Sequence, residues 1–520
     1  MKVEVYLWGT LVGTLSWDYS VGKSVFAYSR DFLDSPYDIS PVFYSKQNKR
    51  VAPFYGNPAT EGLPEFLADS LPDDWGNALF GLWAQRHHVR LDESNSLAKL
   101  SFIGERAMGA LEFRPAYEDE MGHDEIIALN DLYNQAVKVL QDRSAAILTV
   151  AEEKTLSRLI QLGTSVGGRH AKGLIAIDSK GNVRSGQIAL PRDYKYYILK
   201  FKEDVDIPTS EIEKIYCDMA SDCGIRMMPS SLYRVEGVEH FLTQRFDRTD
   251  TGEKLHVQTL KALVPSAKDY ANIFWLIESL RIKESRKEQL FRQMVFNYFA
   301  GVSDDHSKNF SFIMDKNGEW DLSPAYDLTF TSNTWLDPSA YVHSLCVWGK
   351  NSHVSKDDFI DFGEDFGIES SQKIVKEVAD VVSTFPSRSQ KYGIEKEWTD
   401  KIWKVLQTFL PQPKPSQASV VGLTGIVETL RAHFGEKFVF IDEVRLSANG
   451  NAGGTIVHFN LDQKKRTCVT DEKTGDVCVS PGHIQPGELH MGSWKTLSGK
   501  PAVVHLGRVI SLESKMKAEK

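Results

Sequence analysis

The sequence predicts an α+β protein built from several domains. Its hydrophobic residues alternate in some short runs and recur every three or four residues in others, which indicates strands and helices in one molecule. The 520 residues suffice for roughly three or four folding units, each with its own core. Three alternating prolines, Pro411, Pro413 and Pro415, separate a strand-rich end from the rest. We therefore expect α+β domains followed by an extra strand-rich C-terminal domain.

The composition is that of an ordinary globular protein. Hydrophobic residues make up 42% and charged residues 25% of the chain, which excludes a disordered, collagen-like or coiled-coil protein. The formal net charge of −9 argues against a primary nucleic-acid binder, because phosphate contacts need a clustered basic surface. The sequence contains no run of about eighteen apolar residues and no signal-peptide pattern, so we expect a cytoplasmic protein without membrane contact.

Residues 1–115 are predicted to form an N-terminal α/β subdomain. Alternating residues at 2–8 and 11–17 flank Gly9-Thr10, which predicts a β-hairpin. Residues 63–86 follow a helical pattern that prolines interrupt, and glycines then mark a return to strand in residues 102–115. The subdomain is therefore expected to combine a small sheet with helices.

Residues 116–250 are predicted to contain a second small sheet beside helices. The pattern is helical from about residue 125 to 162 and then changes to short apolar or alternating runs. A helix at about 210–223 lies between the second and third of these runs. The four predicted strands are residues 173–178, 196–201, 231–235 and 240–246.

Residues 251–410 are predicted to be mostly helical. In residues 287–300 an apolar face repeats with the period of a helix. A loop at 300–309 follows, and then a strand pair whose turn is Lys316-Asn317-Gly318. The remaining residues to about 410 again favour helices.

Residues 411–417 are predicted to be an extended linker, because alternating prolines remove hydrogen-bond donors and favour a polyproline-like chain. Beyond it, residues 418–435 suggest one helix and residues 453–512 suggest strands joined by glycine turns. Cys468 and Cys478 lie symmetrically about Lys473 in a predicted hairpin and could face each other across it. Because the five cysteines include no C-x-x-C pair, we interpret them as thiols of a reducing compartment.

Three segments carry the residue types that phosphoryl transfer needs. The reaction requires a backbone cradle with a cation for phosphates, ligands for magnesium and a carboxylate that orients the acceptor hydroxyl. Residues 164–172 offer the cradle, because paired glycines can turn N–H groups toward an anion and Lys172 follows as a point charge. On pattern alone, Gly-Gly before a strand is usually a turn, and the segment matches neither common glycine-rich phosphate motif.

Lys200 stands within an apolar strand, where an unpartnered cation is expensive to bury. Glu213 on the next helix can be its partner, which would give the strand-lysine to helix-glutamate ion pair that protein kinases require. The alternative is a lysine at the end of a half-exposed strand with its ammonium group in water.

The loop of residues 303–309 is the sharpest local signal. Asp304 precedes Asn309 by five residues, the spacing at which a kinase holds its catalytic aspartate and a magnesium-binding asparagine, and Lys308 between them can neutralise a phosphate. Asp327 follows across a hairpin as a second acidic magnesium ligand. Each aspartate alone could be a helix cap or turn residue, but the ordered set favours a kinase-like site.

Four motifs together resemble the HipA family, the serine/threonine-kinase toxins of bacterial type II toxin–antitoxin systems. The motifs are residues 165–172 (SVGGRHAK), 244–248 (QRFDR), 303–310 (SDDHSKNF) and 322–327 (LSPAYD). The likeness covers about residues 1–410. It implies a kinase-like two-lobed fold with an N-terminal subdomain (1–115), an N-lobe (116–250) and a mostly helical C-lobe (251–410). Residues 418–520 have no recognisable counterpart in the family core.

The resemblance also implies roles for individual residues. Asp304 would be the catalytic base with Lys308 beside it, Asn309 and Asp327 would bind Mg²⁺, and Ser165 matches the serine that family members phosphorylate on themselves. At the hinge, Gln244 stands where glutamate is common in the family, which changes charge but not the backbone contacts. The residues implied in ATP binding are Val166, Gly167, Gly168, Arg169, His170, Ala171, Lys172, Lys200, Glu213, Gln244, Arg245, Phe246, His306, Ser307, Lys308, Asn309 and Tyr326.

The family resemblance implies partners as well. Family members phosphorylate aminoacyl-tRNA synthetases or other translation factors, and a helix-turn-helix antitoxin neutralises them, so DNA would be reached only through that partner. Two alternatives stay open on the sequence. One is an enzyme of the same fold that phosphorylates a lipid or small molecule, and the other is a non-catalytic corepressor or scaffold bound to the antitoxin.

Overall fold

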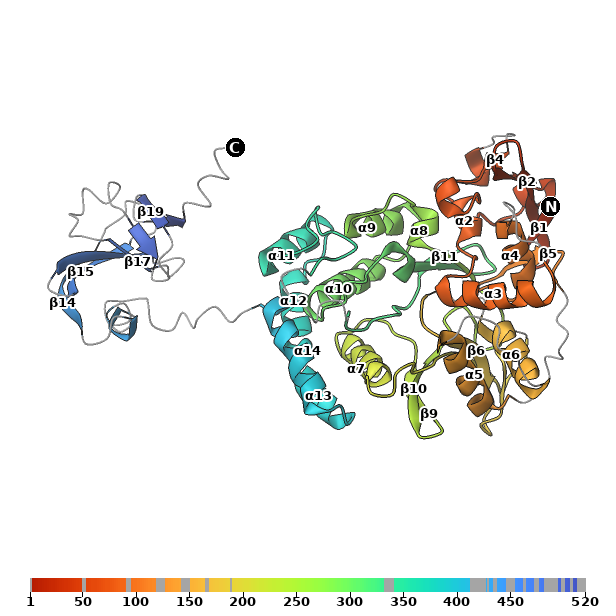
Figure 1. Ribbon diagram of the computed structural model, residues 1–520. Coiled ribbons are helices and arrows are strands. Elements are labelled where there is room, and N and C mark those ends of the chain that lie inside the picture. The colour runs from red at the N-terminus through yellow and green to blue at the C-terminus, as the bar shows by residue number, and fades with distance from the viewer. Residues whose placement is uncertain are drawn as a thin grey trace. The chain divides into compact units, whose positions relative to one another are not determined.

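The computed structural model divides the chain into two compact units, residues 1–411 and 412–520 (Figure 1). The division falls inside the proline-rich segment. In the first unit the structure describes residues 2–48, 53–89, 95–117, 127–141, 150–163, 168–187, 189–331 and 341–411. In the second it describes residues 427, 430–433, 437–445, 454–461, 464–471, 477–480, 494–496, 501–505 and 508–511.

The N-terminal part contains a five-stranded antiparallel sheet in the order β4-β3-β2-β1-β5. Trp8 and Gly9 both have positive φ, 48° and 81°, and form the tight turn between β1 and β2, which confirms the predicted hairpin. The strands are β1 (Lys2–Leu7), β2 (Thr10–Asp18), β3 (Lys23–Tyr28), β4 (Phe54–Tyr55) and β5 (Leu111–Arg114). The helices are α1 (Arg30–Leu33), α2 (Glu65–Ala68), α3 (Asp74–Arg86) and α4 (Asn95–Ile103), with 3₁₀ turns at Lys46–Asn48 and Pro58–Thr60.

A second antiparallel sheet has the order β7-β6-β8-β10-β9. All four strands predicted for residues 173–246 are present, and β7 is an addition that the sequence pattern did not indicate. The helix α3 packs its buried Trp75 and Leu79 into the same core as this sheet, so this piece of the N-terminal subdomain supports the second sheet. The elements are β6 (Lys172–Ile177), β7 (Val183–Ser185), β8 (Lys195–Lys200), β9 (Ser230–Val235), β10 (Val238–Gln244), α5 (Leu129–Gln141), α6 (Val150–Gly163) and α7 (Thr209–Asp222).

The region to residue 411 is mostly helical, as predicted. The predicted apolar face of α10 is buried, with Leu290, Phe291, Met294 and Val295 fully inaccessible in the largest core. A three-stranded sheet, β11-β12-β13, lies beside the helices. The elements are β11 (His256–Thr259), α8 (Leu260–Leu263), α9 (Tyr270–Ser279), α10 (Ser285–Phe299), η3 (Ser307–Asn309), β12 (Ser311–Met314), β13 (Trp320–Leu322), α11 (Lys356–Asp365), α12 (Ser371–Val382), α13 (Phe385–Lys391) and α14 (Lys396–Phe409).

The second unit is a seven-stranded antiparallel meander, as its strand-rich sequence predicts. Cys468 pairs with Val479 and Cys478 pairs with Val469, one residue out of the expected register. The expectation that the two cysteines face each other is therefore wrong, because adjacent residues of a strand point to opposite faces. The predicted helix at 418–435 lies almost entirely outside the described residues. The strands are β14 (Phe438–Arg445), β15 (Gly454–Leu461), β16 (Lys464–Asp471), β17 (Val477–Val479), β18 (Trp494–Thr496), β19 (Pro501–His505) and β20 (Arg508–Ser511).

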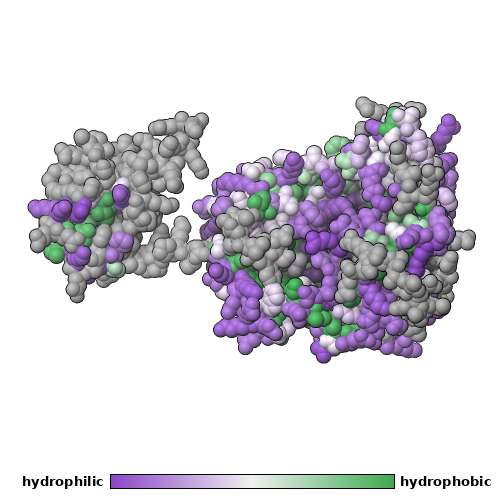
Figure 2. Space-filling model, in the orientation of Figure 1, coloured by the Kyte–Doolittle hydropathy of each residue, from purple (hydrophilic) through white to green (hydrophobic). Residues whose placement is uncertain are grey.

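The surface of the first unit is mostly hydrophilic on the face shown in Figure 2, where hydrophobic residues form small separate groups. Among the residues that the structure describes, no helix combines the length and the apolar character that crossing a bilayer would need.

Candidate active site

Lys200 forms the centre of a charged cluster that joins three elements. From the end of β8, its Nζ donates to Glu213 Oε1 on α7 at 2.6 Å and to Asp327 Oδ1 in the segment after β13. We call Lys200, Glu213 and Asp327 the lysine triad. The sequence left two possibilities for Lys200, a pair with Glu213 or an ammonium group in water, and the structure shows the pair. Asp327, which was expected to return to the same edge, completes the triad from 127 positions along the chain.

Burial and charge act on the pKa values of the triad in opposite directions. Burial alone would lower the pKa of Lys200, but the carboxylates of Asp327 and Glu213 raise it far above its ordinary value. The charge of Lys200 holds the pKa of Asp327 well below its usual range, whereas burial raises that of Glu213. Lys200 and Asp327 are therefore both ionised at neutral pH, and the ammonium group is fixed in position before any ligand arrives.

Asp327 is held in an uncommon backbone conformation. Its φ is 57°, in the left-handed region, which aspartate tolerates better than most residues and which is concentrated at functional sites. The preceding residue fixes this segment, because the Tyr326 hydroxyl donates to the Lys308 carbonyl at 2.6 Å and lies 2.6 Å from the Ser311 hydroxyl. Asp327 and the loop that carries Asn309 are thereby tied together.

The glycine-rich segment is described from Gly168 onward, and Ser165, Val166 and Gly167 lie outside the described residues. Gly168 has φ of 102°, and a Cβ on it would lie 2.4 Å from the amine of Lys172, so a side chain at this position would strain the backbone and crowd the lysine. Burial and the charge of Lys200, its register partner on β8, lower the pKa of Lys172 to about 8. Two lysines therefore meet at this edge of the sheet.

Glu203 fixes the far end of the same segment. Its Oε1 accepts from the Ala171 N–H at 2.8 Å and lies 3.2 Å from His170 Nδ1. Sequence reasoning did not identify Glu203, since a lone glutamate after a strand carries no motif. His170 and Arg169 are exposed beside it.

The loop after α10 exposes the predicted catalytic aspartate. The Asp304 side chain is 69% exposed, and His306 Nε2 lies 3.9 Å from its Oδ1. Two hydrogen bonds hold the loop: Asn309 Nδ2 donates to the Asp304 carbonyl at 2.8 Å, and the Asp304 N–H donates to Thr331 Oγ1 at 3.2 Å. The carboxylate is therefore held at the surface, where it can receive a proton from an acceptor.

Asp305, the next residue, is the buried anchor of this loop. Its carboxylate accepts from the Tyr270 hydroxyl at 2.7 Å and from the Ser344 N–H at 2.8 Å, and it lies 2.9 Å from His343 Nδ1. The His343 ring stacks on Tyr298 with centroids 3.6 Å apart. The sequence offered two adjacent aspartates, and only the fold separates the exposed one from the structural one.

Asp73 is the second functional candidate that sequence reasoning missed. Its carboxylate accepts from Lys308 Nζ and, at 2.9 Å, from the Gly168 N–H. Nearby, the Trp75 indole donates to the Lys172 carbonyl at 3.0 Å. The start of α3 is therefore part of the site, although the only signal in the sequence was a Pro-Asp-Asp helix start.

At the predicted hinge, the Arg245 side chain makes its hydrogen bonds inside the protein. It is fully buried, donates twice to Asp247 at 2.8 and 2.7 Å, and donates to the Gly186 carbonyl at 2.7 Å. A nucleotide could therefore meet Arg245 only at its backbone. Gln244 is half-buried, and the Phe246 ring lies 5.4 Å from that of Tyr326, which leaves an aromatic surface beside the triad.

The donor set suits a magnesium ion. Asp327 offers an ionised carboxylate and Asn309 an amide oxygen, and Mg²⁺ is typically held by one or two carboxylates together with substrate phosphates and water. Ser307 and His306 are half-buried on the same loop. Asn309 and Asp327 are thus the residues that would hold the metal between the loop and the triad.

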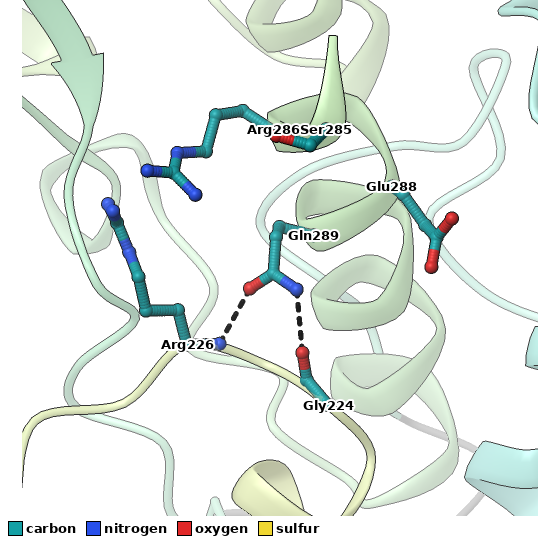
Figure 3. A pocket seen from close by; sticks show the side chains of 6 residues that line it. All are labelled: Gly224, Arg226, Ser285, Arg286, Glu288 and Gln289. Carbon is teal, nitrogen blue, oxygen red and sulfur yellow. Dashed lines mark hydrogen bonds between the residues drawn. The ribbon is translucent and has the colours of Figure 1, made fainter. Parts of the chain in front are cut away.

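A surface pocket of about 350 Å³ lies at the start of α10 (Figure 3). Gln289 bridges its floor, accepting from the Arg226 N–H at 2.7 Å and donating to the Gly224 carbonyl at 2.6 Å. Arg226 and Arg286 both bind Asp321, so the two guanidinium groups share one carboxylate. None of the six lining residues belongs to the predicted site.

Two segments of the chain match known protein families. Residues 164–387 match the HipA-like C-terminal domain, and residues 3–114 match the HipA N-terminal domain. A Haemophilus influenzae protein named "Putative kinase" is 24% identical over 201 residues, which cover 33% of this chain and 55% of that protein. The chain thus spans about half the length of that curated relative.

Two further likenesses extend over more of the chain. The Sinorhizobium fredii protein "Putative kinase Y4dM" is 22% identical over 356 residues, 63% of this chain and 77% of its own. A solved structure of the Shewanella oneidensis toxin–antitoxin system, HipA and HipB with operator DNA, aligns with a TM-score of 0.55 and 16% identity. The alignment covers 78% of this chain and 96% of that one, and at this identity it concerns the fold alone.

Proposed function

Because the chain belongs to the HipA family, we propose that it is a serine/threonine protein kinase that uses ATP and Mg²⁺. The observation that carries the proposal is the lysine triad, in which Lys200 is held between Glu213 and Asp327. Such an ion pair must be in place for kinases to bind the nucleotide phosphates. Its presence here, beside an exposed Asp304, also argues against a degenerate, non-catalytic fold.

Each residue then has a definite task. Lys200 binds the α- and β-phosphates, and the N–H groups of the glycine-rich segment with Lys172 receive the phosphate chain. Asp304 accepts the proton of the acceptor hydroxyl, whose oxygen bonds to the γ-phosphorus as ADP leaves with the electron pair of the broken bond. Lys308 neutralises charge on the transferring group. Bound at Asn309 and Asp327, Mg²⁺ would supply further charge neutralisation.

We further propose the biological setting that the family resemblance implies. The substrate would be a protein of the translation machinery, whose phosphorylation arrests growth, and Ser165 would be the site of self-phosphorylation. A phosphate at Ser165 would carry a charge of about −1.5 to −2 at the phosphate-binding segment and would repel ATP. The Shewanella oneidensis neighbour is a complex with HipB and operator DNA, which supports a helix-turn-helix antitoxin as partner and only indirect contact with DNA.

The test is transfer of labelled phosphate from ATP. Purified protein with Mg²⁺ and γ-labelled ATP should label itself on serine, and Asp304→Asn should abolish the label. Asp357→Asn, which changes an exposed aspartate on α11, is the matched control and should label normally. Label that persists in Asp304→Asn would contradict the proposal, and label that passes only into lipid or small-molecule acceptors would replace the protein substrate with that class.

A further inference from the structure

A carboxylate from the N-terminal subdomain lies at the phosphate end of the site. Asp73 precedes α3, and its two oxygens have different partners: Oδ1 accepts from Lys308 Nζ, and Oδ2 accepts from the Gly168 N–H at 2.9 Å. The two donors belong to different segments, Gly168 before β6 and Lys308 after α10, and the proposed function assigns both to the phosphates of ATP. A carboxylate that bridges them satisfies the donors that phosphate oxygens would otherwise use.

The position of Asp73 in its helix shows that these bonds are not a by-product of capping. Asp73 is the N-cap residue of α3, with φ of −82° and ψ of −165°, and an aspartate there ordinarily accepts from the N–H two or three residues on. Its side chain makes no such bond. Loss of a cap bond typically costs about 1 kcal/mol. The Asp73 side chain makes its bonds to Gly168 and Lys308 in place of that stabilising bond.

The electrostatic surroundings of Asp73 are those of a bound anion. Burial alone would raise the pKa of Asp73, but the charge and hydrogen bond of Lys308, the Gly168 N–H and the charge of Lys172 lower it. The Asp73 side chain is 28% exposed and that of Lys308 is 45% exposed. The bridge therefore holds an ionised carboxylate in a cationic setting that an incoming ligand can reach.

We propose that Asp73 is an internal competitor for the terminal phosphate of ATP. The inference rests on the proposed function and adds to it a residue that sets nucleotide affinity. When ATP binds, Lys308 and the Gly168 N–H exchange the Asp73 carboxylate for phosphate oxygens. The apparent association constant for ATP is then the intrinsic constant multiplied by the fraction of molecules in which the bridge is open. ADP lacks the terminal phosphate, so it competes with Asp73 for the Gly168 N–H but not for Lys308.

The experiment measures nucleotide affinity by titration calorimetry with Mg-ATP and Mg-ADP. The test variant is Asp73→Asn, which keeps the shape of the side chain and removes its charge. Asp74→Asn is the matched control, because Asp74 is the adjacent, exposed acid at the first position of α3. If the bridge is closed in about 90% of molecules, Asp73→Asn should bind ATP about tenfold more tightly, and its gain in affinity for ADP should be clearly smaller. Asp74→Asn should change neither.

The outcomes separate this inference from the proposed function. A wild type that binds neither nucleotide overturns the proposed function itself. A wild type that binds ATP, with an Asp73→Asn variant that binds it no more tightly or gains equally for ADP, overturns the competitor role and leaves the kinase. Should Asp73→Asn fold poorly, Asp73→Ser supplies a neutral residue that can cap α3. The same selective gain for ATP is then expected of that variant.

Discussion

The two halves of the site differ in how deeply they are set in the fold. In the lysine triad, the side chains of Lys200 and Glu213 are only 18% and 11% exposed, and Lys200 also binds Asp327, which is 43% exposed. Across the site, the Asp304 side chain is 69% exposed and makes one long contact with His306. The difference teaches that the triad supports the structure as well as the chemistry, whereas Asp304 is free to serve the chemistry alone.

The largest expected effect is on activity at the exposed half. Asp304→Asn should lower phosphoryl transfer by about 10² to 10⁴-fold, the usual contribution of a general base, and should leave the free energy of unfolding within about 0.5 kcal/mol. Single-turnover assays and urea unfolding of the same preparation measure the two quantities. A large loss of stability would show that the two halves do not differ as described.

A substitution in the lysine triad should lower both the stability of the protein and its activity. Lys200→Met leaves the Glu213 and Asp327 carboxylates without their cation, and removing one partner of a buried ion pair costs about 3 kcal/mol. Urea unfolding should report that loss, together with loss of ATP binding in calorimetry. Lys195→Met, at the exposed start of β8, is the matched control and should change neither. Equal free energies of unfolding for the two variants would contradict a structural role of the triad.

The same contrast in stability can be tested on two adjacent residues, the buried Asp305 and the exposed Asp304. Asp305→Asn replaces one oxygen of a buried acceptor by a donor, which then faces either the Tyr270 hydroxyl, bound to Oδ2, or the Ser344 N–H, bound to Oδ1. Leaving such groups unsatisfied costs about 2 kcal/mol. The free energy of unfolding should fall by that amount in Asp305→Asn and remain unchanged in Asp304→Asn. Equal stabilities would contradict the assignment of Asp305 as the anchor.

The smallest expected effect is a pH dependence at Lys172. Its pKa is about 8 in the folded protein, so Lys172 carries its charge below pH 8 and loses it above. Affinity for the anionic nucleotide should weaken severalfold as pH rises from 7 to 9. Over the same range Lys172 should make the free energy of unfolding larger, because the folded state releases a proton that the unfolded state retains.

Calorimetry at successive pH values measures the affinity. Lys172→Arg should flatten the profile, since a guanidinium group stays ionised throughout. An unchanged midpoint in Lys172→Arg would show that another group titrates.

Much of the fold could be read from local patterns. The hairpin at Gly9, the four strands of the second sheet and the apolar face of α10 were predicted, because each depends on periodicity that a single segment carries. The additions β7 and β11 were missed, since they are three and four residues long and owe their form to neighbouring strands. The register of Cys468 and Cys478 was missed by one residue, because the pattern within one strand does not fix which residues it faces on the next.

The sequence by itself supplied the candidate residues of the site: Lys200 with Glu213 as one possible partner, the spacing of Asp304 and Asn309, and Asp327 across the hairpin. Those residues lie in motifs, and a motif keeps its residue types within short stretches of chain. Only the tertiary structure decided that Asp305 is buried while Asp304 is exposed, and that Asp73 reaches Gly168 and Lys308. Such contacts join segments 95 and 235 positions apart, and packing alone brings residues so distant in the chain within hydrogen-bonding distance.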